Sequence, residues 1–282
     1  MDLATLAAEA TELRREILQA LYDCGGGHYG GTLSVLDLLL TLYRCQLRIF
    51  PDHPEDPHRD RLILSKGHAA LALYAVQRRL GFYHHPLAGY GTATSPLEGH
   101  PDVAELPEVE FSTGSLGQGL SVGVGMALAL REQQPEAAPR SLPQVWVVLG
   151  DGECQEGQVW EAAMLAARLG LTNLTAVIDA NGYQEYGWAP QGDPCPVPDL
   201  PAKLRAFGWR VTEVDGHDHG NLAQVFDQII TSSEEPGARS PAAVVARTVK
   251  GKGVPLAEAD PLRFHCTTVT QEEHHRMLAG LS

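Results

Sequence analysis

The segment Gly150-Asp151-Gly152 carries the clearest chemical signal in the sequence, together with Asn181 further along the chain. An Asp carboxylate and an Asn side-chain carbonyl are hard oxygen ligands, which suit Mg²⁺ or Ca²⁺. The glycines let the backbone approach a diphosphate, and a following helix would direct its N–H groups at that anion. Gly-Asp-Gly alone equally indicates a tight turn between a strand and a helix. With Asn181 in the corresponding place after the next strand, the pattern favours a metal–diphosphate site.

Histidines that follow a glycine form the second signal: His28, His68, His100 and His217. A glycine neighbour leaves the ring free to approach a ligand, and imidazole can bond diphosphate or sugar oxygens and move protons near pH 7. One such histidine is more often structural, but several in a chain with a metal–diphosphate pattern favour a polar substrate funnel. Six other histidines are expected to be exposed: His53, His58, His84, His85, His274 and His275.

The third signal is the segment 112–119 (STGSLGQG), which precedes an Ala- and Gly-rich helix expected over 120–130. Gly119, Gly123 and Ala127 follow one another at a spacing of four and leave a bare helix face. The apolar run is too short and too polar for a membrane GxxxG pair. We therefore expect this face to make a tight helix–helix contact, within the chain or between chains.

The elements that must position these residues begin with helices. Apolar residues at steps of three and four predict an amphipathic helix over 3–21, which ends at the glycines 25–27. Ser34 and Asp37 resemble a capping box and predict a helix from there to about residue 47. A loop is expected over 50–60, a helix over 69–80, and an irregular stretch over 83–113.

From residue 144 the pattern changes to strands that alternate with helices. Strands are expected over 144–149, 174–179, 209–214 and 242–249, and helices over 155–169, 201–207 and 222–230. Such alternation predicts an α/β fold with a doubly wound, mostly parallel sheet and helices on both faces, whose ligands bind at the carboxyl ends of the strands. We expect one domain over 1–282, with N-terminal helices over 1–48. An irregular C-terminal segment over 250–282 is expected to pack over the sheet edge.

Composition excludes several classes of partner. The 282 residues include 21 Lys and Arg against 35 Asp and Glu, a formal net charge of −14 without a basic cluster. This balance argues against nucleic acid or an anionic membrane as a partner. No apolar stretch reaches the roughly 18 residues of a membrane span, and the first residues lack the pattern of a signal peptide. Five scattered cysteines make a poor disulfide framework and a poor zinc site, so we expect a cytoplasmic protein. They are Cys24, Cys45, Cys154, Cys195 and Cys266.

Taken together, these segments resemble the N-terminal, thiamine diphosphate-binding half of the transketolases over about residues 10 to 270. The segments that carry the resemblance are GHYGGTLS, DRLILSKGHAALALY, EGHP, STGSLGQGLSVGVGMALA, GDGECQEGQVWEA with the later DANGYQ, VDGHD and KGKGV. They follow the order of that family. The resemblance implies thiamine diphosphate as the cofactor, bound with Mg²⁺ or Ca²⁺.

The resemblance also implies roles for individual residues around that cofactor. Asp151 and Asn181 would ligate the metal, with the backbone carbonyl of Tyr183 as the third protein ligand. The residues implied to contact the diphosphate are His68, Gly152 and His265. Those implied to line the thiazolium and aminopyrimidine rings are Gly114, Ser115 and Leu116.

The substrate side of the site would be formed by histidines. His28 and His100, again with His68 and His265, would meet the hydroxyls around C1 and C2 of a ketose. Glu156 resembles the family glutamate that links cofactor sites across a subunit interface, although a charge at a helix N-terminus is an alternative. Two departures concern the substrate more than the cofactor: Tyr29 replaces the family's proline, and segment 263–266 (RFHC) replaces a Trp-His-Gly-Lys pattern.

The chain corresponds to about half of a full transketolase. The family's catalytic glutamate and sugar-phosphate arginines lie in the pyrimidine-binding domain, which the resemblance does not cover. We therefore expect one subunit of a split enzyme that transfers a two-carbon ketol unit from a ketose to an aldehyde. Its partner would be a separate C-terminal transketolase-like subunit, in a heterotetramer with two copies of each chain. Two alternatives stay open: an α-type subunit of a 2-oxo acid decarboxylase, dehydrogenase or acyloin-forming enzyme, and a non-catalytic cofactor-binding subunit.

Overall fold

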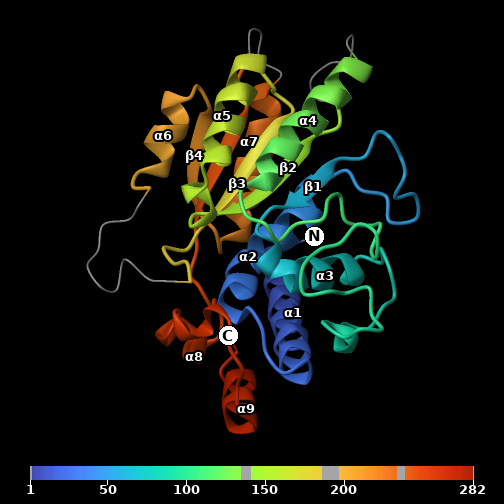
Figure 1. Cartoon of the computed structure of the whole chain (residues 1–282), viewed down its shortest axis with the longest axis vertical. Coiled ribbons are helices and arrows are strands. Elements are labelled where there is room, and N and C mark those ends of the chain that lie inside the picture. The colour runs from blue at the N-terminus through green and yellow to red at the C-terminus, as the bar shows by residue number, and fades with distance from the viewer. Residues whose placement is uncertain (1, 135–140, 186–196, 234–238, 282) are drawn as a thin grey trace.

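A parallel five-stranded sheet forms the centre of the computed structural model, which describes residues 2–134, 141–185, 197–233 and 239–281 (Figure 1). The strand order is β1-β2-β3-β5-β4, and every neighbouring pair is parallel. The central strands are buried on both faces, as expected for a parallel sheet covered by helices. The bounds are β1 (Arg61–Leu64), β2 (Val145–Gly150), β3 (Leu174–Ala180), β4 (Arg210–Asp215) and β5 (Ala242–Arg247).

The four strands predicted after residue 144 are confirmed, whereas β1 was missed. β1 is only four residues long and lies between a proline-rich loop and the turn that carries Lys66 and His68. A strand this short shows no periodicity that distinguishes it from a loop. Its pairing with β2 determines where that turn lies, because both strands end at the same edge of the sheet.

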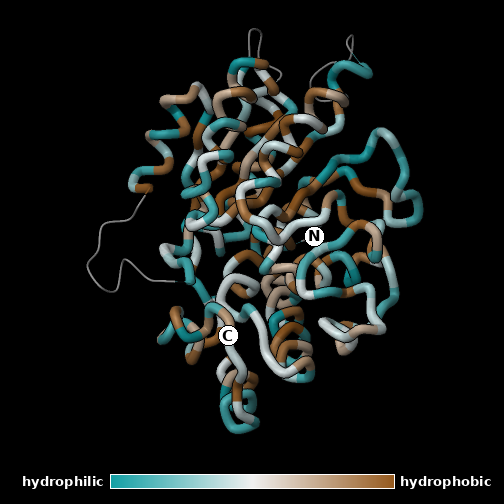
Figure 2. The backbone as a smooth tube through the Cα atoms, in the orientation of Figure 1, coloured by the Kyte–Doolittle hydropathy of each residue, from teal (hydrophilic) through white to brown (hydrophobic). Residues whose placement is uncertain are grey.

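Helices cover both faces of the sheet, which confirms the doubly wound α/β class. α4 (Gln118–Gln133), α5 (Gly157–Leu169) and α6 (Leu200–Ala206) cover one face, and α7 (His219–Ser233) and the N-terminal helices cover the other. The side chains of β2 alternate accordingly: Val147 faces the α4 and α5 side, while Trp146 meets Phe226 of α7 with ring centroids 5.4 Å apart. Apolar and polar residues alternate along the covering helices (Figure 2).

The first helix, α1 (Leu3–Asp23), is confirmed, and α2 (Tyr29–Thr41) begins earlier than the sequence predicts. Ser34 and Asp37 therefore lie inside α2 and are buried, so their interpretation as a capping box was wrong. Gly30, in the first turn of α2, lets the side chain of Lys250 pack closely against the helix, since a Cβ at this position would lie 2.8 Å from Cγ of Lys250. A π-helical turn over Leu42–Gln46 follows α2.

The loop over 50–60 and the irregular stretch over 83–113 are confirmed, the latter interrupted by a 3₁₀ turn over Leu87–Gly89. Between them, a 3₁₀ turn over Gly67–Ala69 leads into α3 (Ala70–Arg79), as predicted. Arg59 pairs with Glu110 and thereby ties the two irregular segments together. Their conformations are held by such side-chain contacts rather than by a repeating backbone pattern.

The C-terminal segment packs against the N-terminal helices and not over the sheet edge, so that prediction was wrong. It contains α8 (Pro255–Ala259), a 3₁₀ turn over Arg263–His265 and α9 (Gln271–Ala279). α9 contacts α1, and Thr267 forms a β-bridge with Gly27 (Figure 1). His274 of α9 was expected to be exposed but is 3% exposed, because its ring stacks on Tyr22 with centroids 4.2 Å apart.

The glycine face of α4 packs on the sheet, which corrects the expected helix–helix contact. A Cβ on Gly119 would lie 2.5 Å from Cβ of Ser65, and one on Gly123 would lie 2.5 Å from Cγ2 of Val147. These glycines let α4 approach β1 and β2 closely. Within the described residues, no helix has the length and apolar character to cross a membrane, and the four described cysteines are unpaired. Cys195 lies outside the described residues.

Candidate functional site

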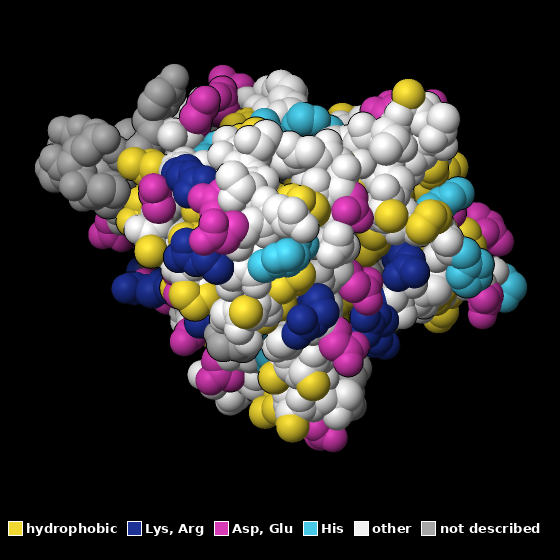
Figure 3. All heavy atoms as spheres, turned by 90° about the horizontal axis from the view of Figure 1, so that it is seen from below, with side chains coloured by type: hydrophobic (Ala, Val, Ile, Leu, Met, Phe, Trp, Pro, Cys, Tyr) yellow, Lys and Arg dark blue, Asp and Glu magenta, His cyan; other side chains and the backbone are white. Residues whose placement is uncertain are grey.

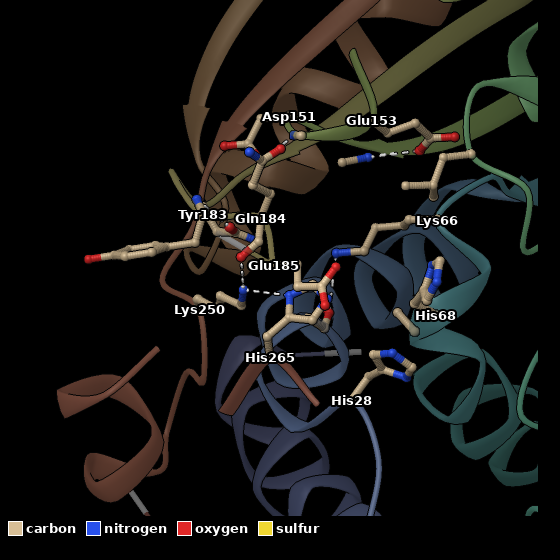
Figure 4. A pocket seen from close by; sticks show the side chains of 16 residues that line it. His28, Lys66, His68, Asp151, Glu153, Tyr183, Gln184, Glu185, Lys250 and His265 are labelled. Atoms are coloured by element: carbon tan, nitrogen blue, oxygen red, sulfur yellow. Dashed lines mark hydrogen bonds between the residues drawn. The ribbon is translucent and has the colours of Figure 1, made fainter. Parts of the chain in front are cut away.

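A cavity of about 310 Å³ opens at the carboxyl ends of the strands (Figure 4). Lys66 follows β1, Asp151 follows β2, Asn181 follows β3 and Lys250 follows β5, so four strand ends converge on it. Such edges are where ligands bind in open parallel sheets. The predicted site residues that line the cavity are His28, His68, Leu116, Asp151, Gly152, Asn181, Tyr183 and His265.

Asp151 and Asn181 lie together at this edge, as the spacing predicts. The carboxylate of Asp151 accepts the N–H of Gly152 at 2.8 Å and that of Gly182 at 2.6 Å, which joins the turn after β2 to the turn after β3. The side-chain oxygen of Asn181 accepts the N–H of Tyr183 at 3.0 Å. Burial, with the charge of nearby Asp179, raises the pKa of Asp151 to about 6.

This donor set fits a divalent cation that arrives with its own oxygen ligands. A buried carboxylate whose pKa is raised is stabilised by a cation beside it. Among the described residues, no group of three or more His, Cys, Asp or Glu side chains could hold a metal ion. The protein's share would thus be Asp151, Asn181 and a backbone carbonyl, and Mg²⁺ readily takes its remaining oxygens from phosphate and water.

Four of the predicted histidines gather at the cavity. The ring centroids of His28 and His68 are 4.9 Å apart, those of His68 and His100 are 4.9 Å apart, and those of His28 and His265 are 5.7 Å apart. Burial, followed by the charges of neighbouring basic groups, lowers the pKa of His28 to about 4 and that of His265 to about 3. Both rings are therefore neutral at pH 7 and can donate or accept hydrogen bonds.

His217 does not belong to this cluster, so its prediction as part of a substrate funnel was wrong. It follows β4, the edge strand, and lies behind the cavity rather than in it. Its Nδ1 lies 2.7 Å from a carboxylate oxygen of Asp37, and its Nε2 accepts the N–H of Val249 at 2.8 Å. A glycine precedes His217 just as one precedes His28 and His68, so the sequence signal is the same. The topology nevertheless places His217 outside the cavity.

The segment 114–116 lies beside the histidines. A Cβ on Gly114 would lie 3.0 Å from Cδ2 of His100, and one on Gly67 would lie 2.7 Å from the backbone N of Gly114. Both glycines therefore allow the turn after β1 to meet this segment. Leu116 lines the cavity, whereas Ser115 is exposed and does not line it. Glu156 is exposed at the start of α5, outside the cavity.

Two buried charged residues that the sequence analysis missed underlie the site. Lys66 lines the cavity and forms an ion pair with Asp179, which is fully buried. Burial alone would raise the pKa of Asp179, but the charge of Lys66 holds that pKa below its ordinary value. Glu153 joins three loops, since its carboxylate accepts the N–H of Gly117 at 2.8 Å and of Gly150 at 3.1 Å and the hydroxyl of Ser65.

Lys250 is the third residue missed. Its ammonium donates to the backbone carbonyl of Gln184 at 3.0 Å and contacts Nδ1 of His265 at 2.9 Å (Figure 4). Burial, with the charge of Lys66, lowers its pKa to about 8. Lys66 and Lys250 both lie in segments that carry the family resemblance, DRLILSKGHAALALY and KGKGV. The lysine that directly precedes a glycine in each segment, Lys66-Gly67 and Lys250-Gly251, was the sequence signal that could have identified these two residues.

Charged side chains of both signs gather in the cavity of a chain whose overall charge is negative. Two lysines and three histidines line it against the carboxyls of Asp151, Glu153 and Glu185. On the face seen in Figure 3, basic and acidic side chains are interspersed. The two lysines suit an anionic ligand such as a diphosphate, and the carboxylate of Asp151 suits a cation bound together with it.

Comparisons with known proteins agree with this chemistry. A family model described as "Transketolase, thiamine diphosphate binding domain" matches residues 7–279. The chain is 37% identical to the 6-deoxy-6-sulfo-D-fructose transketolase subunit of Clostridium sp. strain MSTE9, over 98% of this chain and 96% of that protein. It is 34% identical to an apulose-4-phosphate transketolase subunit of Phocaeicola vulgatus, over 100% of this chain and 95% of that one. Transketolase from Campylobacter jejuni superposes with a TM-score of 0.85 at 27% identity, over 97% of this chain and 42% of that structure.

Proposed function

The chain belongs to the transketolase family, and from that premise we propose that it is the thiamine diphosphate-binding subunit of a two-chain enzyme that transfers ketol units. The reaction moves a two-carbon unit from a ketose or related donor to an aldehyde acceptor. Two relatives that the chain matches over nearly their whole length are themselves named as transketolase subunits. The family match favours this function over the α subunit of a 2-oxo acid dehydrogenase or decarboxylase.

One observation carries the proposal: His28, His68 and His265 line a cavity that also holds Asp151 and Asn181, and His100 packs against this histidine cluster. A metal–diphosphate site alone would serve several classes of thiamine diphosphate enzyme. The imidazoles of His28 and His265, which are neutral at pH 7, provide hydrogen-bond partners for a substrate with several hydroxyls, as a ketose has. The combination is what a ketol transferase requires.

We assign the cofactor contacts to residues that line the cavity. Asp151, Asn181 and the backbone carbonyl of Tyr183 would hold Mg²⁺, and His68, Gly152 and His265 would contact the diphosphate. Leu116, with Gly114 and Ser115 beside it, would lie against the rings of the cofactor. When bound, thiamine diphosphate supplies the carbanion that attacks a ketone and carries the two-carbon unit.

The chain's own residues would orient the substrate. His28 and His100, with His68 and His265, would bond the hydroxyls next to the reacting carbonyl and so fix the donor in one pose. Because His28 is neutral at pH 7, it can accept a proton from a hydroxyl or donate one to a developing oxyanion. Glu156, exposed at the start of α5, would face a second subunit.

The partner would be a separate polypeptide with the pyrimidine-binding domain, in a heterotetramer with two copies of each chain. The names of the two subunit relatives support a partner. The donor and acceptor are small carbohydrates. The cytoplasmic location inferred from the cysteines stays a prediction.

The proposal is tested with the reconstituted two-chain complex, thiamine diphosphate and Mg²⁺. Supplied with a panel of ketose donors and an aldehyde acceptor, the complex is expected to convert the acceptor into a ketose two carbons longer and the donor into an aldose two carbons shorter. Pyruvate in place of the ketose is the control donor. Turnover of pyruvate but of no ketose would assign the chain to the 2-oxo acid enzymes, and cofactor binding without turnover of either would indicate a non-catalytic subunit.

A further inference from the structure

Lys250 is almost fully buried next to the candidate cofactor site, and its side chain is held along its length. The residue is 3% exposed, and its aliphatic stem packs against Gly30, where a Cβ would lie 2.8 Å from Cγ of the lysine. Its ammonium ends between the backbone carbonyl of Gln184, at 3.0 Å, and Nδ1 of His265, at 2.9 Å (Figure 4). The ring of Tyr183 also lies near the ammonium, with its centroid 5.9 Å from the nitrogen.

This contact determines which nitrogen of His265 carries the proton. An ammonium has three donors and no acceptor, so Nδ1 of His265 must accept the hydrogen bond. A neutral imidazole holds one proton, which must then be on Nε2. The ring is neutral at pH 7, because burial and the charge of Lys250 lower its pKa to about 3. His265 is therefore a donor through Nε2 in a ring that lines the cavity.

The loop that carries Lys250 is fixed from behind by His217. Nδ1 of His217 lies 2.7 Å from the carboxylate of Asp37, which can only accept, so this ring has its proton on Nδ1. Its Nε2 then accepts the N–H of Val249 at 2.8 Å. On the other side of Lys250, the N–H of Gly251 donates to the carbonyl of Gly30 at 3.1 Å. The two flanking residues are thus anchored, and the lysine between them has a defined position.

We propose that Lys250 is a positioning residue that holds His265 in the Nε2–H tautomer, so that His265 offers a hydrogen-bond donor to an anionic or hydroxyl oxygen in the cavity. A histidine whose second nitrogen is bound to a fixed partner has a fixed tautomer and ring orientation, as in many catalytic sites. Whether the bound oxygen belongs to a diphosphate or to a sugar rests on the proposed function. The tautomer of His265 is independent of that function.

The test is a two-bond ¹H–¹⁵N correlation spectrum of the full chain labelled at histidine, recorded at pH 7.5. His265 is identified by the signals that disappear in His265→Gln. In the wild-type chain it is expected as the Nε2–H tautomer, and His217 as the opposite, Nδ1–H tautomer. A wild-type His265 that has its proton on Nδ1 would overturn the proposal without recourse to any variant.

Lys250→Met keeps the length of the stem and removes the donor. In this variant His265 is expected to populate both tautomers, while His217 keeps its signals and shows that the loop is folded. The matched control is Lys252→Met in the same loop, which is expected to leave His265 unchanged. An unchanged His265 in Lys250→Met would contradict the positioning role.

A binding and turnover experiment connects the tautomer to the proposed function. In the two-chain complex, Lys250→Met is expected to weaken thiamine diphosphate binding or lower kcat by about tenfold or more, since a hydrogen bond to a charged group is lost. Lys252→Met should do neither. If the wild-type complex shows no ketol transfer, the proposed function fails while the tautomer result stands; if only the tautomer differs from expectation, the inference about Lys250 fails alone.

Discussion

Lys66 and Asp179 form a buried ion pair that joins the turn after β1 to the end of β3 at the base of the cavity. The side chain of Lys66 is 9% exposed and that of Asp179 is 0% exposed. Ser34 of α2 donates its hydroxyl to the same carboxylate at 2.6 Å, and Thr248 after β5 also binds it. One carboxylate thus connects four segments that together carry the cofactor site.

Asp179→Asn is expected to destabilise the chain by about 3–5 kcal/mol, because it leaves the charge of Lys66 buried without its partner. Urea unfolding followed by circular dichroism measures the change. Asp52→Asn in the exposed loop over 50–60 is the control and should have little effect. The double variant Lys66→Met/Asp179→Asn should be less destabilised than the sum of the two single variants. Strict additivity would show that the two side chains do not interact.

Asp151→Ala should abolish metal-dependent binding of thiamine diphosphate. The substitution removes the charged ligand from a site where the charge of the diphosphate has to be neutralised. Isothermal titration calorimetry with Mg²⁺ present measures the affinity, and Asp52→Ala is the matched control for loss of an acidic residue. An affinity equal to that of the wild-type chain would exclude Asp151 as a metal ligand.

His100→Ala should lower turnover about tenfold to a hundredfold and leave the affinity for the cofactor nearly unchanged. We place its ring at substrate hydroxyls, and a positioned hydrogen bond to a polar substrate is worth ~1–3 kcal/mol. The kcat of the complex and the Kd of thiamine diphosphate are measured on the same preparations, with exposed His85→Ala as the control. Equal losses in binding and in turnover would assign His100 to the diphosphate instead.

Stability should fall with acid partly because of His28 and His265. Their folded-state pKa values, about 4 and about 3, lie below the ordinary histidine value of 6.5. Between pH 6.5 and these folded-state values, the unfolded chain binds more protons at the two histidines than the folded chain does. The contribution of the neutral histidines to the free energy of unfolding is therefore complete above pH 6.5 and is lost as the pH falls towards 4 and 3. Urea midpoints at pH 7.5 and 5 measure this loss. It should be smaller in His28→Gln than in the wild-type chain, and an equal loss in both would contradict the assignment.

The elements that could be predicted from the sequence are those with a repeating pattern. α1, α5 and α7 each bury one face, and the apolar runs of α3 and of the strands after residue 144 are long enough to identify them. β1 is too short to show a pattern, and α2 begins among glycines that usually end helices. Both depend on tertiary contacts: β1 pairs with β2, and Gly30 meets the stem of Lys250.

Site residues could be predicted where each one directly follows a predicted strand of the parallel sheet. Asp151 and Asn181 each follow a strand, so topology alone brings them together. His217 follows a glycine as His28 does, but it comes after the edge strand β4, which leaves it outside the cavity. Lys66, Glu153 and Lys250 act through partners far away in the sequence, such as Asp179 and His265, which no local pattern reveals.

The central claim is that this chain is one half of a split transketolase, and it is tested most directly by a ketol-transfer assay of the pure chain with and without its partner. Size-exclusion chromatography with light scattering accompanies the assay. The account predicts no transfer by the chain alone, and transfer by a complex with two copies of each subunit, whose interfaces bury upward of ~2,000 Å² each. Ketol transfer by the rigorously pure single chain would contradict it.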